Sequence, residues 1–475
     1  MRPESSRKYK KLGSNILLFT LGNIGSKLIT FFLVPLYTAA LTTEQYGITD
    51  LIFTLYNLLI PVVTIEIYFG LMRFSLEEDA DHRQLFSSSL YVTLFGLLIL
   101  LICRPAFIWF DAIAPYFWFF IAYCFTNSMN TVLLYFARGI DHVKDYAITT
   151  IINTACVVSF NIVFLLYLHM GVNGYLLAYT LSHLLASLYL MVRLKVWRYI
   201  LPPVAIDRSL IIKLAIYCIP LIPNTISWWI SNQSDKFVII LFDGLALSGI
   251  YAISYKIPSI LSVVSNIFIN AWQISSVDEF GSDNSKKFYS DIYEKYVSVQ
   301  LMMTSAVMLL CKVAAKILFK NEFFEAWHYI PLLTLAVMFH AMGTFFASVY
   351  TAAKKTKGIG ISTLAAAAIN IALNFLLIPR FHAYGAAFAT LVSYVVIVIV
   401  RIIHSRQFFK FEINFGNDLL CYAILAGQMF ISTFDLKYRF AISLACFALL
   451  FIIRRKSFLD MLHMTWRLIQ KRKKK

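Results

Sequence analysis

The chain has 475 residues, of which 60% are hydrophobic and 14% are charged, and its formal net charge at pH 7 is +17. This composition excludes an ordinary water-soluble core and is typical of an integral membrane protein. The basic residues are scattered over short connecting segments, which argues against nucleic-acid binding. The seven cysteines show no CxxC spacing and lie mostly in apolar stretches, so they predict neither a disulfide framework nor a metal site.

Long apolar stretches recur along the chain, and the gaps between them are too short for a soluble domain. Because about 20 apolar residues can cross a bilayer as a helix, we predict an all-α integral membrane protein with about 14 transmembrane helices. Most of the 42 Lys and Arg residues fall in the N-terminal tail and every second gap, so both termini are predicted to be cytoplasmic. The predicted spans are 14–41, 47–72, 86–103, 113–136, 147–169, 172–193, 210–233, 246–272, 297–318, 328–352, 358–378, 384–402, 418–433 and 440–453.

The first span carries a lysine, Lys27, near its middle. A lysine that faces lipid at this depth costs about 3 kcal/mol on insertion scales. Asn23 shares its helical face with Lys27, together with Thr20 and Thr30, because these residues recur every three or four positions. We predict that Lys27 and Asn23 line a polar cavity. The alternative is a lysine that pairs with a carboxylate and serves only packing.

The second span contains two charged residues near its inner end, Glu66 and Arg73, which lie two helical turns apart. Arg73 is a candidate for the inner part of a cavity, and an arginine that only anchors the interface fits the same pattern. Glu66 is a candidate for coupling to protons or sodium, because ionisable side chains within a membrane commonly mark ion pathways.

The seventh span combines two prolines with a polar face. Pro220 and Pro223 remove backbone hydrogen bonds and permit a bend. Asn224, Ser231 and Asp235 follow on one face and are predicted to line the cavity. Asp235 is a second candidate for ion coupling, with an interfacial ion pair as its alternative.

The eighth span carries Lys256, roughly 15 Å from its predicted outer end at helical rise. Lys256 either pairs with Asp235 or faces the cavity. A polar stripe follows it, and Asn266 on this stripe is a further candidate for the cavity wall. Lys27 and Lys256 give each half of the chain a buried positive charge, which suits an anion and opposes a cationic drug. The stripe consists of Ser259, Ser262, Asn266, Asn270 and Gln273.

The order of features repeats after six spans. Tyr46–Ile48 before the second span corresponds to Ser248–Ile250 before the eighth, and 161–193 corresponds to 374–401. We therefore predict two pseudo-symmetric six-helix bundles, as in transporters built from parallel repeats. The predicted domains are an N-terminal lobe at 1–200, a second lobe at 201–410, and two additional transmembrane helices with a basic cytoplasmic tail at 411–475.

Motifs along most of the chain, and most densely between residues 210 and 400, resemble those of bacterial polysaccharide flippases of the O-antigen (Wzx) type. They are IPLIPNTISWWI at 219–230, Asp235–Lys236, Lys256–Pro258, Lys354–Lys357 and Gly385–Ala387. The resemblance implies the fold of the multidrug/oligosaccharidyl-lipid/polysaccharide exporters, a V-shaped, MATE-like architecture of two six-helix bundles. It also implies movement of a polyprenyl-pyrophosphate-linked oligosaccharide from the cytoplasmic to the periplasmic leaflet. Asp235 and Lys256 match positions of the family pattern.

We therefore expect a multi-pass transport protein of the bacterial cytoplasmic (inner) membrane that works by alternating access. Its expected partners are the lipid bilayer, the lipid-linked oligosaccharide, and a glycan polymerase with its chain-length regulator. The sequence contains no GxxxxGK[ST] motif and no catalytic nucleophile–base pair, so we predict no enzyme activity, no cofactor and no metal. The alternatives are a flippase for a lipid-linked peptidoglycan precursor, a MATE-type drug exporter, and an integral membrane glycan polymerase or ligase.

Overall fold

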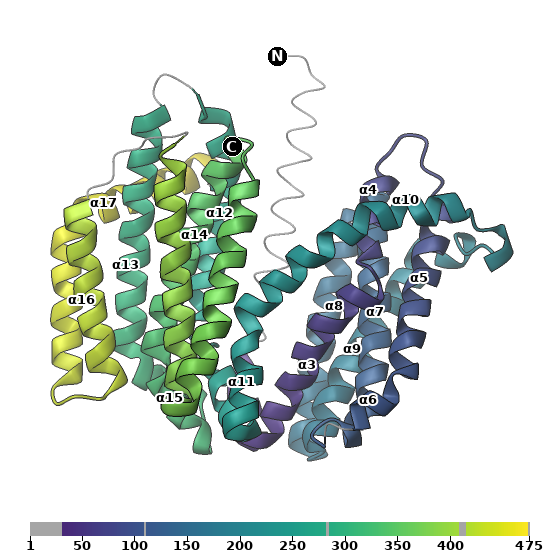
Figure 1. Ribbon diagram of the computed structural model, residues 1–475, viewed down its shortest axis with the longest axis horizontal. Coiled ribbons are helices and arrows are strands. Elements are labelled where there is room, and N and C mark those ends of the chain that lie inside the picture. Colours follow the sequence, from purple (N-terminus) through teal and green to yellow (C-terminus); the bar gives the residue numbers. More distant parts are fainter. Residues whose placement is uncertain (1–30, 109–110, 282–284, 408–414, 474–475) are drawn as a thin grey trace. The chain divides into compact units, whose positions relative to one another are not determined.

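The computed structural model describes residues 31–108, 111–281, 285–407 and 415–473, which form helices joined by turns and short connections (Figure 1). Each predicted span falls on helical structure in these residues, the first of them only from residue 31 onward. Nine helical segments of the described part are long and apolar enough to cross a membrane, and the longest, Lys357–Ser405, contains two predicted spans. The architecture therefore agrees with the all-helical membrane class expected from the sequence.

The described residues up to Trp229 form the first of two compact units. In this unit α9 packs along both α7 and α8, and α4 packs on α7. Ile67, Leu71, Phe86 and Phe136 belong to a buried cluster that joins α4, α5 and α7. The helices of this unit are α2 (Val34–Ala40), α3 (Thr43–Val63), α4 (Ile67–Ser75), α5 (His82–Ile102), α6 (Arg104–Ile108), α7 (Phe117–Gly139), α8 (Val143–Asn161), α9 (Gly171–Leu194), α10 (Arg208–Cys218) and the first turns of α11 (Ile222–Ser254).

Helix starts in this unit follow local capping chemistry. At α3 the Thr42 hydroxyl accepts from the Gln45 amide, and the Gln45 side chain accepts from the Thr42 amide, which forms a capping box. At α10 the Asp207 carboxylate accepts from the hydroxyl and the amide of Ser209. These hydrogen bonds hold the pKa of Asp207 below its usual value. The charged side chain of Asp207 therefore caps the N-terminus of α10.

The second predicted span, 47–72, is wrong as one continuous helix. Ile65 and Glu66 adopt the left-handed conformation, with φ of 48° and 52°, and separate α3 from α4. This conformation is uncommon for residues other than glycine and persists where surrounding contacts hold it. The break places Glu66 at the N-cap of α4.

The second compact unit begins at Ile230, within α11. Two of its helices are interrupted by left-handed residues, α11 at Gly244 with φ of 86° and α15 at His382 with φ of 52°. Each of these helices therefore contains two segments. Beyond α11, the unit consists of α12 (Ser259–Glu279), α13 (Ser285–Leu318), the 3-10 turns Asn321–His328, α14 (Ile330–Ala352), α15 (Lys357–Ser405), α16 (Phe415–Thr433) and α17 (Arg439–Lys473).

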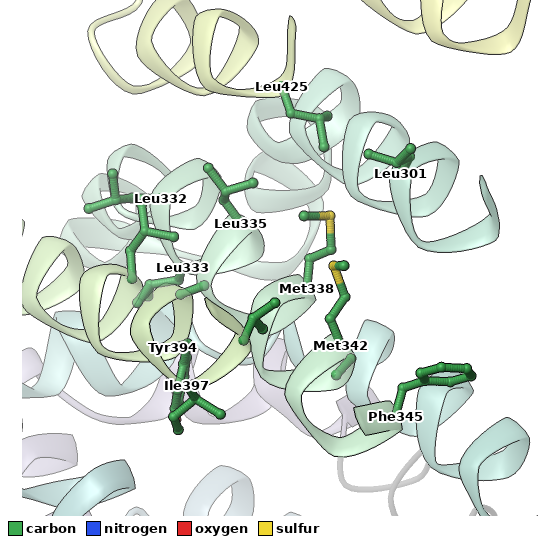
Figure 2. Close-up of a cluster of buried hydrophobic side chains, with 14 of the residues drawn as sticks. Leu301, Leu332, Leu333, Leu335, Met338, Met342, Phe345, Tyr394, Ile397 and Leu425 are labelled. Carbon is green, nitrogen blue, oxygen red and sulfur yellow. The ribbon is translucent and has the colours of Figure 1, made fainter. Parts of the chain in front are cut away.

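Helix α14 is the centre of the second unit, where it packs against α12, α13, α15 and α16 (Figure 1). Figure 2 shows Met338 and Met342 of α14 in the buried cluster, with Leu301 of α13 and Leu425 of α16 close by. Phe345 of the same helix is 1% exposed and stacks on a tryptophan of α12. In a membrane such van der Waals packing is a main source of helix association, so α14 organises this unit.

The two segments of α15 approach each other closely at Gly385. A Cβ atom at this position would lie 2.7 Å from the carbonyl carbon and oxygen of Leu377. Only glycine allows this contact, as is common where helices meet within membranes.

Helices α16 and α17 pack on α13 and α14 and belong to the second compact unit. The domain boundaries predicted at residues 200 and 410 stay predictions, as does the duplication of two six-helix bundles.

Candidate functional site

Glu66 is a buried carboxylate at the break between α3 and α4. It is 1% exposed, and its Oε1 accepts a hydrogen bond of 2.7 Å from the Thr225 hydroxyl of α11. Its Oε2 accepts no hydrogen bond of normal geometry from the described part of the chain, although Tyr68 is close enough to interact with the carboxylate. An under-satisfied carboxylate in strained backbone has the properties of a group that binds a proton or cation.

Arg73 lies at the exposed end of α4. Its guanidinium is 3.6 Å from Glu77, and Lys213 of α10 approaches the same carboxylate at 3.8 Å. This surface ion-pair cluster fits the interfacial alternative at least as well as a role in a cavity. Lys27 and Asn23, the predicted cavity residues of the first span, lie outside the described residues.

Asp235 lies on α11 in the second unit and is 3% exposed. Its Oδ2 accepts hydrogen bonds from the hydroxyl groups of Tyr251, at 2.8 Å, and Tyr255, at 3.2 Å. Its Oδ1 accepts from the backbone amide of Lys236. Two tyrosine hydroxyls and a backbone amide satisfy this carboxylate, and the charge of the neighbouring Lys236 also acts on it.

A hydrogen-bond network of asparagine side chains links α11 to α15. It begins at Ser234, the residue before Asp235. Asn370 Oδ1 accepts from the Ser234 hydroxyl and from Asn374 Nδ2, and Asn370 Nδ2 donates to Thr390 across the break in α15. Asn374 Oδ1 is buried and has no hydrogen-bond partner among the residues that the structure describes. Most of these groups bond between helices, as polar side chains in membrane bundles commonly do.

Lys256 lies in the turn between α11 and α12, and its side chain is half-buried. Within the described ranges it forms no ion pair, because the carboxylate of Asp235 is taken by tyrosines. Of the two alternatives for Lys256, pairing with Asp235 is therefore not realised.

The polar stripe of α12 is exposed or half-buried along its whole length. Asn266 lies at its middle and is exposed, whereas the buried hydroxyl of the preceding Ser265 accepts from Gln300 of α13. In a membrane helix, an exposed polar face requires water or another polar surface, because lipid cannot satisfy it. On the predicted polar face of α11, the exposure of the side chains differs. Asn224 is exposed, whereas Ser231 is 7% exposed and lies among packed helices.

Sequence reasoning missed the tyrosines that complete these clusters. Tyr394 of α15 donates to Asn232 at 3.0 Å, in addition to the two tyrosines that hold Asp235. Tyrosine is common in this chain and gave no distinguishing signal, although Tyr251 and Tyr255 are one turn apart and adjoin Lys256.

In the described part, no group of three or more His, Cys, Asp or Glu residues could hold a metal ion.

Buried polar clusters within long apolar helices define a polytopic membrane protein, and solved structures share its fold. A multidrug-resistance transporter of the MATE family and MOP superfamily, in an inward-facing conformation, matches with a TM-score of 0.68 and 15% identity over 83% of this chain and 97% of its own. The Lipid II flippase MurJ, inward closed, matches with a TM-score of 0.66 and 14% identity over 94% and 99%. A MOP-superfamily transporter from Pyrococcus furiosus matches with a TM-score of 0.58 and 15% identity over 83% and 95%. The predicted all-helical, MATE-like fold class is confirmed.

The family follows from the sequence profile described as "Polysaccharide biosynthesis protein", which matches residues 12–273, more than half of the chain. The chain belongs to this family. No curated protein matches it. The solved structures that share its fold are described as transporters and a flippase.

Proposed function

We propose that this protein is a flippase that moves a polyprenyl-pyrophosphate-linked oligosaccharide from the cytoplasmic to the periplasmic leaflet by alternating access. The observation that carries the proposal is the exposed polar stripe of α12 beside Lys256, in a chain of a polysaccharide-biosynthesis family. Such a face suits the hydroxyl groups of sugars, and the lysine suits a phosphate group.

The charge of the proposed site favours an anionic lipid headgroup. A lysine ammonium binds phosphate as a compact point charge, and it acts strongly where water is scarce. The MOP-superfamily transporter of Pyrococcus furiosus is described as having a binding pocket of reverse polarity that suggests a different function. Pocket charge is therefore a reasonable guide to substrate class within this fold. Asn23, Lys27 and Asn224 are further proposed substrate contacts, on the basis of the sequence.

Glu66 and Asp235 are the proposed coupling groups. Each is a buried carboxylate that accepts hydrogen bonds from hydroxyl groups. A bound proton or sodium ion would neutralise such a group at low cost. The sequence has no nucleotide-binding loop, so an ion gradient or consumption of the product outside would supply the driving force.

The lysines provide the direct test. We expect the double variant Lys27→Ala, Lys256→Ala to lose at least about tenfold in the rate of lipid-linked glycan translocation into the outer leaflet of proteoliposomes, because the pyrophosphate loses both cations. The matched control is Lys27→Arg, Lys256→Arg, which keeps both charges and should retain most activity. Undiminished translocation by a well-expressed alanine variant would exclude this role.

A second candidate is a flippase for a lipid-linked peptidoglycan precursor, since the Lipid II flippase MurJ matches 94% of this chain. Both candidates carry a pyrophosphate-linked lipid and differ in the sugars carried. Rescue of a strain depleted of its own Lipid II flippase would favour the second candidate. Accumulation of lipid-linked oligosaccharide in a deletion strain that keeps normal cell-wall synthesis would favour the first.

A further inference from the structure

The break between α3 and α4 contains two consecutive left-handed residues, Ile65 and Glu66. Of the residues that the structure describes, they are the only chain neighbours that both adopt this conformation. It crowds the Cβ atom of an L-residue against the following carbonyl, and the branched side chain of Ile65 makes it still less favourable. The local sequence therefore favours one continuous helix, and tertiary contacts must hold the break.

Backbone hydrogen bonds at the break are rearranged. In a continuous helix the Ile67 amide would donate to the Val63 carbonyl, whereas here it donates to the Thr64 carbonyl at 3.1 Å. The Thr64 hydroxyl donates to the Ile60 carbonyl at 2.8 Å. The Val63 carbonyl lies against Gly96 of α5, where a Cβ atom would be only 2.0 Å from its oxygen. Because non-helical backbone in a membrane must be enclosed by protein, these contacts make the broken conformation accessible.

The first turns of α11 contact both α3 and the break. Thr225 donates to Glu66 Oε1 at 2.7 Å, and Glu66 is 1% exposed. Trp229 lies one turn later on the same face of α11, and its Nε1 donates to the Thr54 carbonyl of α3 at 2.9 Å. When Glu66 is ionised, the bond from Thr225 is charge-assisted and roughly twice as strong as a neutral one. Thr225 therefore attaches the left-handed Glu66 to a neighbouring helix.

Helix α4, on the other side of the break, packs on α10. A Cβ atom at Gly70 of α4 would lie 2.8 Å from Cys218 Sγ of α10. The 3-10 turn Ile219–Leu221 joins α10 to α11, and it contains Pro220 and is followed by Pro223. Helices commonly bend at prolines, which lack the amide that continues the hydrogen bonding. Since α4 is held by α10 and α3 by α11, bending at this turn would change the angle between α3 and α4.

We propose that residues 64–66 form a two-state hinge. While Thr225 is bonded to Glu66, α3 and α4 are separate helices. When this bond is released, Ile65 and Glu66 return to right-handed geometry, and α3 continues into α4. Helix α11 extends from the first compact unit into the second, so its bending and the state of the hinge would be coupled. The hinge is a property of the fold and does not depend on which lipid is transported.

The test is the distance between spin labels on α3 and α4, measured by double electron–electron resonance on the full-length protein in nanodiscs. Labels carried by a keto amino acid in place of the exposed residues Glu44 and Leu76 leave the native cysteines unchanged. One continuous helix would separate these positions by about 48 Å, at roughly 1.5 Å per residue, and the break gives a shorter distance.

We expect the shorter distance to dominate when Thr225 is present. In Thr225→Val the ratio of the longer to the shorter distance should rise about tenfold, so that the longer distance becomes detectable, because a hydrogen bond to a charged group is lost. Thr225→Ser keeps the hydroxyl and should match the parent protein. If Thr225→Val does not fold, Glu66→Gln weakens the same bond and takes its place.

The strain at Ile65 is tested in the Thr225→Val background. Adding Ile65→Gly removes the Cβ atom that disfavours the left-handed conformation, so the ratio of longer to shorter distance should fall about tenfold. The matched control is Leu59→Gly, which weakens α3 in both states and should leave the ratio unchanged. An unchanged distance distribution in Thr225→Val, or equal effects of the two glycines, would mean that packing alone fixes the break and would overturn the proposal.

Discussion

Three buried charged side chains of this protein have neutral hydrogen-bond partners. Asp235 is bonded by two tyrosine hydroxyls, and Glu66 by a threonine hydroxyl. Arg401 of α15 donates to the Gly343 carbonyl at 2.6 Å and to the hydroxyls of Ser362 and Thr363 at 3.0 Å. Neutral partners satisfy hydrogen bonds without cancelling charge, which keeps carboxylates able to bind a cation.

The carboxylate of Asp235 gives a residue-scale prediction about coupling. Asp235→Asn keeps the size of the side chain and removes its charge. We expect the stimulation of transport by an imposed proton or sodium gradient to fall about tenfold, within the usual range of coupling free energies. The measurement is translocation in proteoliposomes with and without the gradient. Asp291→Asn, on an exposed position of α13, is the control, and an unchanged gradient response in Asp235→Asn would rule out coupling through this residue.

Arg401 gives a prediction about stability. It is 4% exposed, and no ion pair to it occurs in the ranges that the structure covers, so its three neutral acceptors carry its stabilising contacts. Arg401→Met should lower the free energy of unfolding by about 3 kcal/mol, since hydrogen bonds to a charged group are lost and their acceptors stay buried. Thermal unfolding in detergent measures this change, with exposed Lys357→Met of the same helix as control. A melting temperature equal to that of the control would contradict the structural role.

At the scale of elements, a buried ion pair joins α16 to α17 within the second unit. Arg454 of α17 pairs with Asp418 of α16, and both residues are 4% exposed. Tyr293 of α13 donates to the same carboxylate at 3.0 Å. Three helices therefore meet at one carboxylate, which fixes the rotation of each about its axis.

This ion pair predicts strong coupling in a double-mutant cycle. Asp418→Leu or Arg454→Met alone should destabilise the protein by about 3–5 kcal/mol, because each leaves an unpaired buried charge. The double variant should be less destabilised than either single variant, since no charge remains buried. Unfolding followed by tryptophan fluorescence provides the four values. Simple additivity would show that the pair makes no direct interaction.

At the scale of the whole molecule, orientation in the membrane is testable with a native thiol. Cys103 is exposed directly after α5, at the end of the predicted span 86–103 and next to a gap predicted to face the periplasm. A membrane-impermeant thiol reagent should label it in cells whose inner membrane is intact. Glu78→Cys in a Cys103→Ser background should react only after that membrane is permeabilised, because its turn is predicted to be cytoplasmic. The reverse pattern would mean that the predicted topology is inverted.

The sequence alone determined that the protein is helical and spans a membrane, and it identified nearly every apolar helix of the described part. This succeeded because apolar length and helical period are properties of single segments. The exposed polar stripe around Asn266 was predictable for the same reason. The break at Glu66 was not, because neither residue in the left-handed conformation is a glycine, asparagine or aspartate.

Tertiary structure decided which polar groups meet. Asp418 and Arg454 lie 36 residues apart, and nothing in their local sequence marks them as partners. The choice of tyrosines rather than Lys256 as partners of Asp235 is likewise a matter of how helices are rotated and packed. A helical period fixes which side chains share a face, whereas the partner of that face depends on packing between helices distant in sequence.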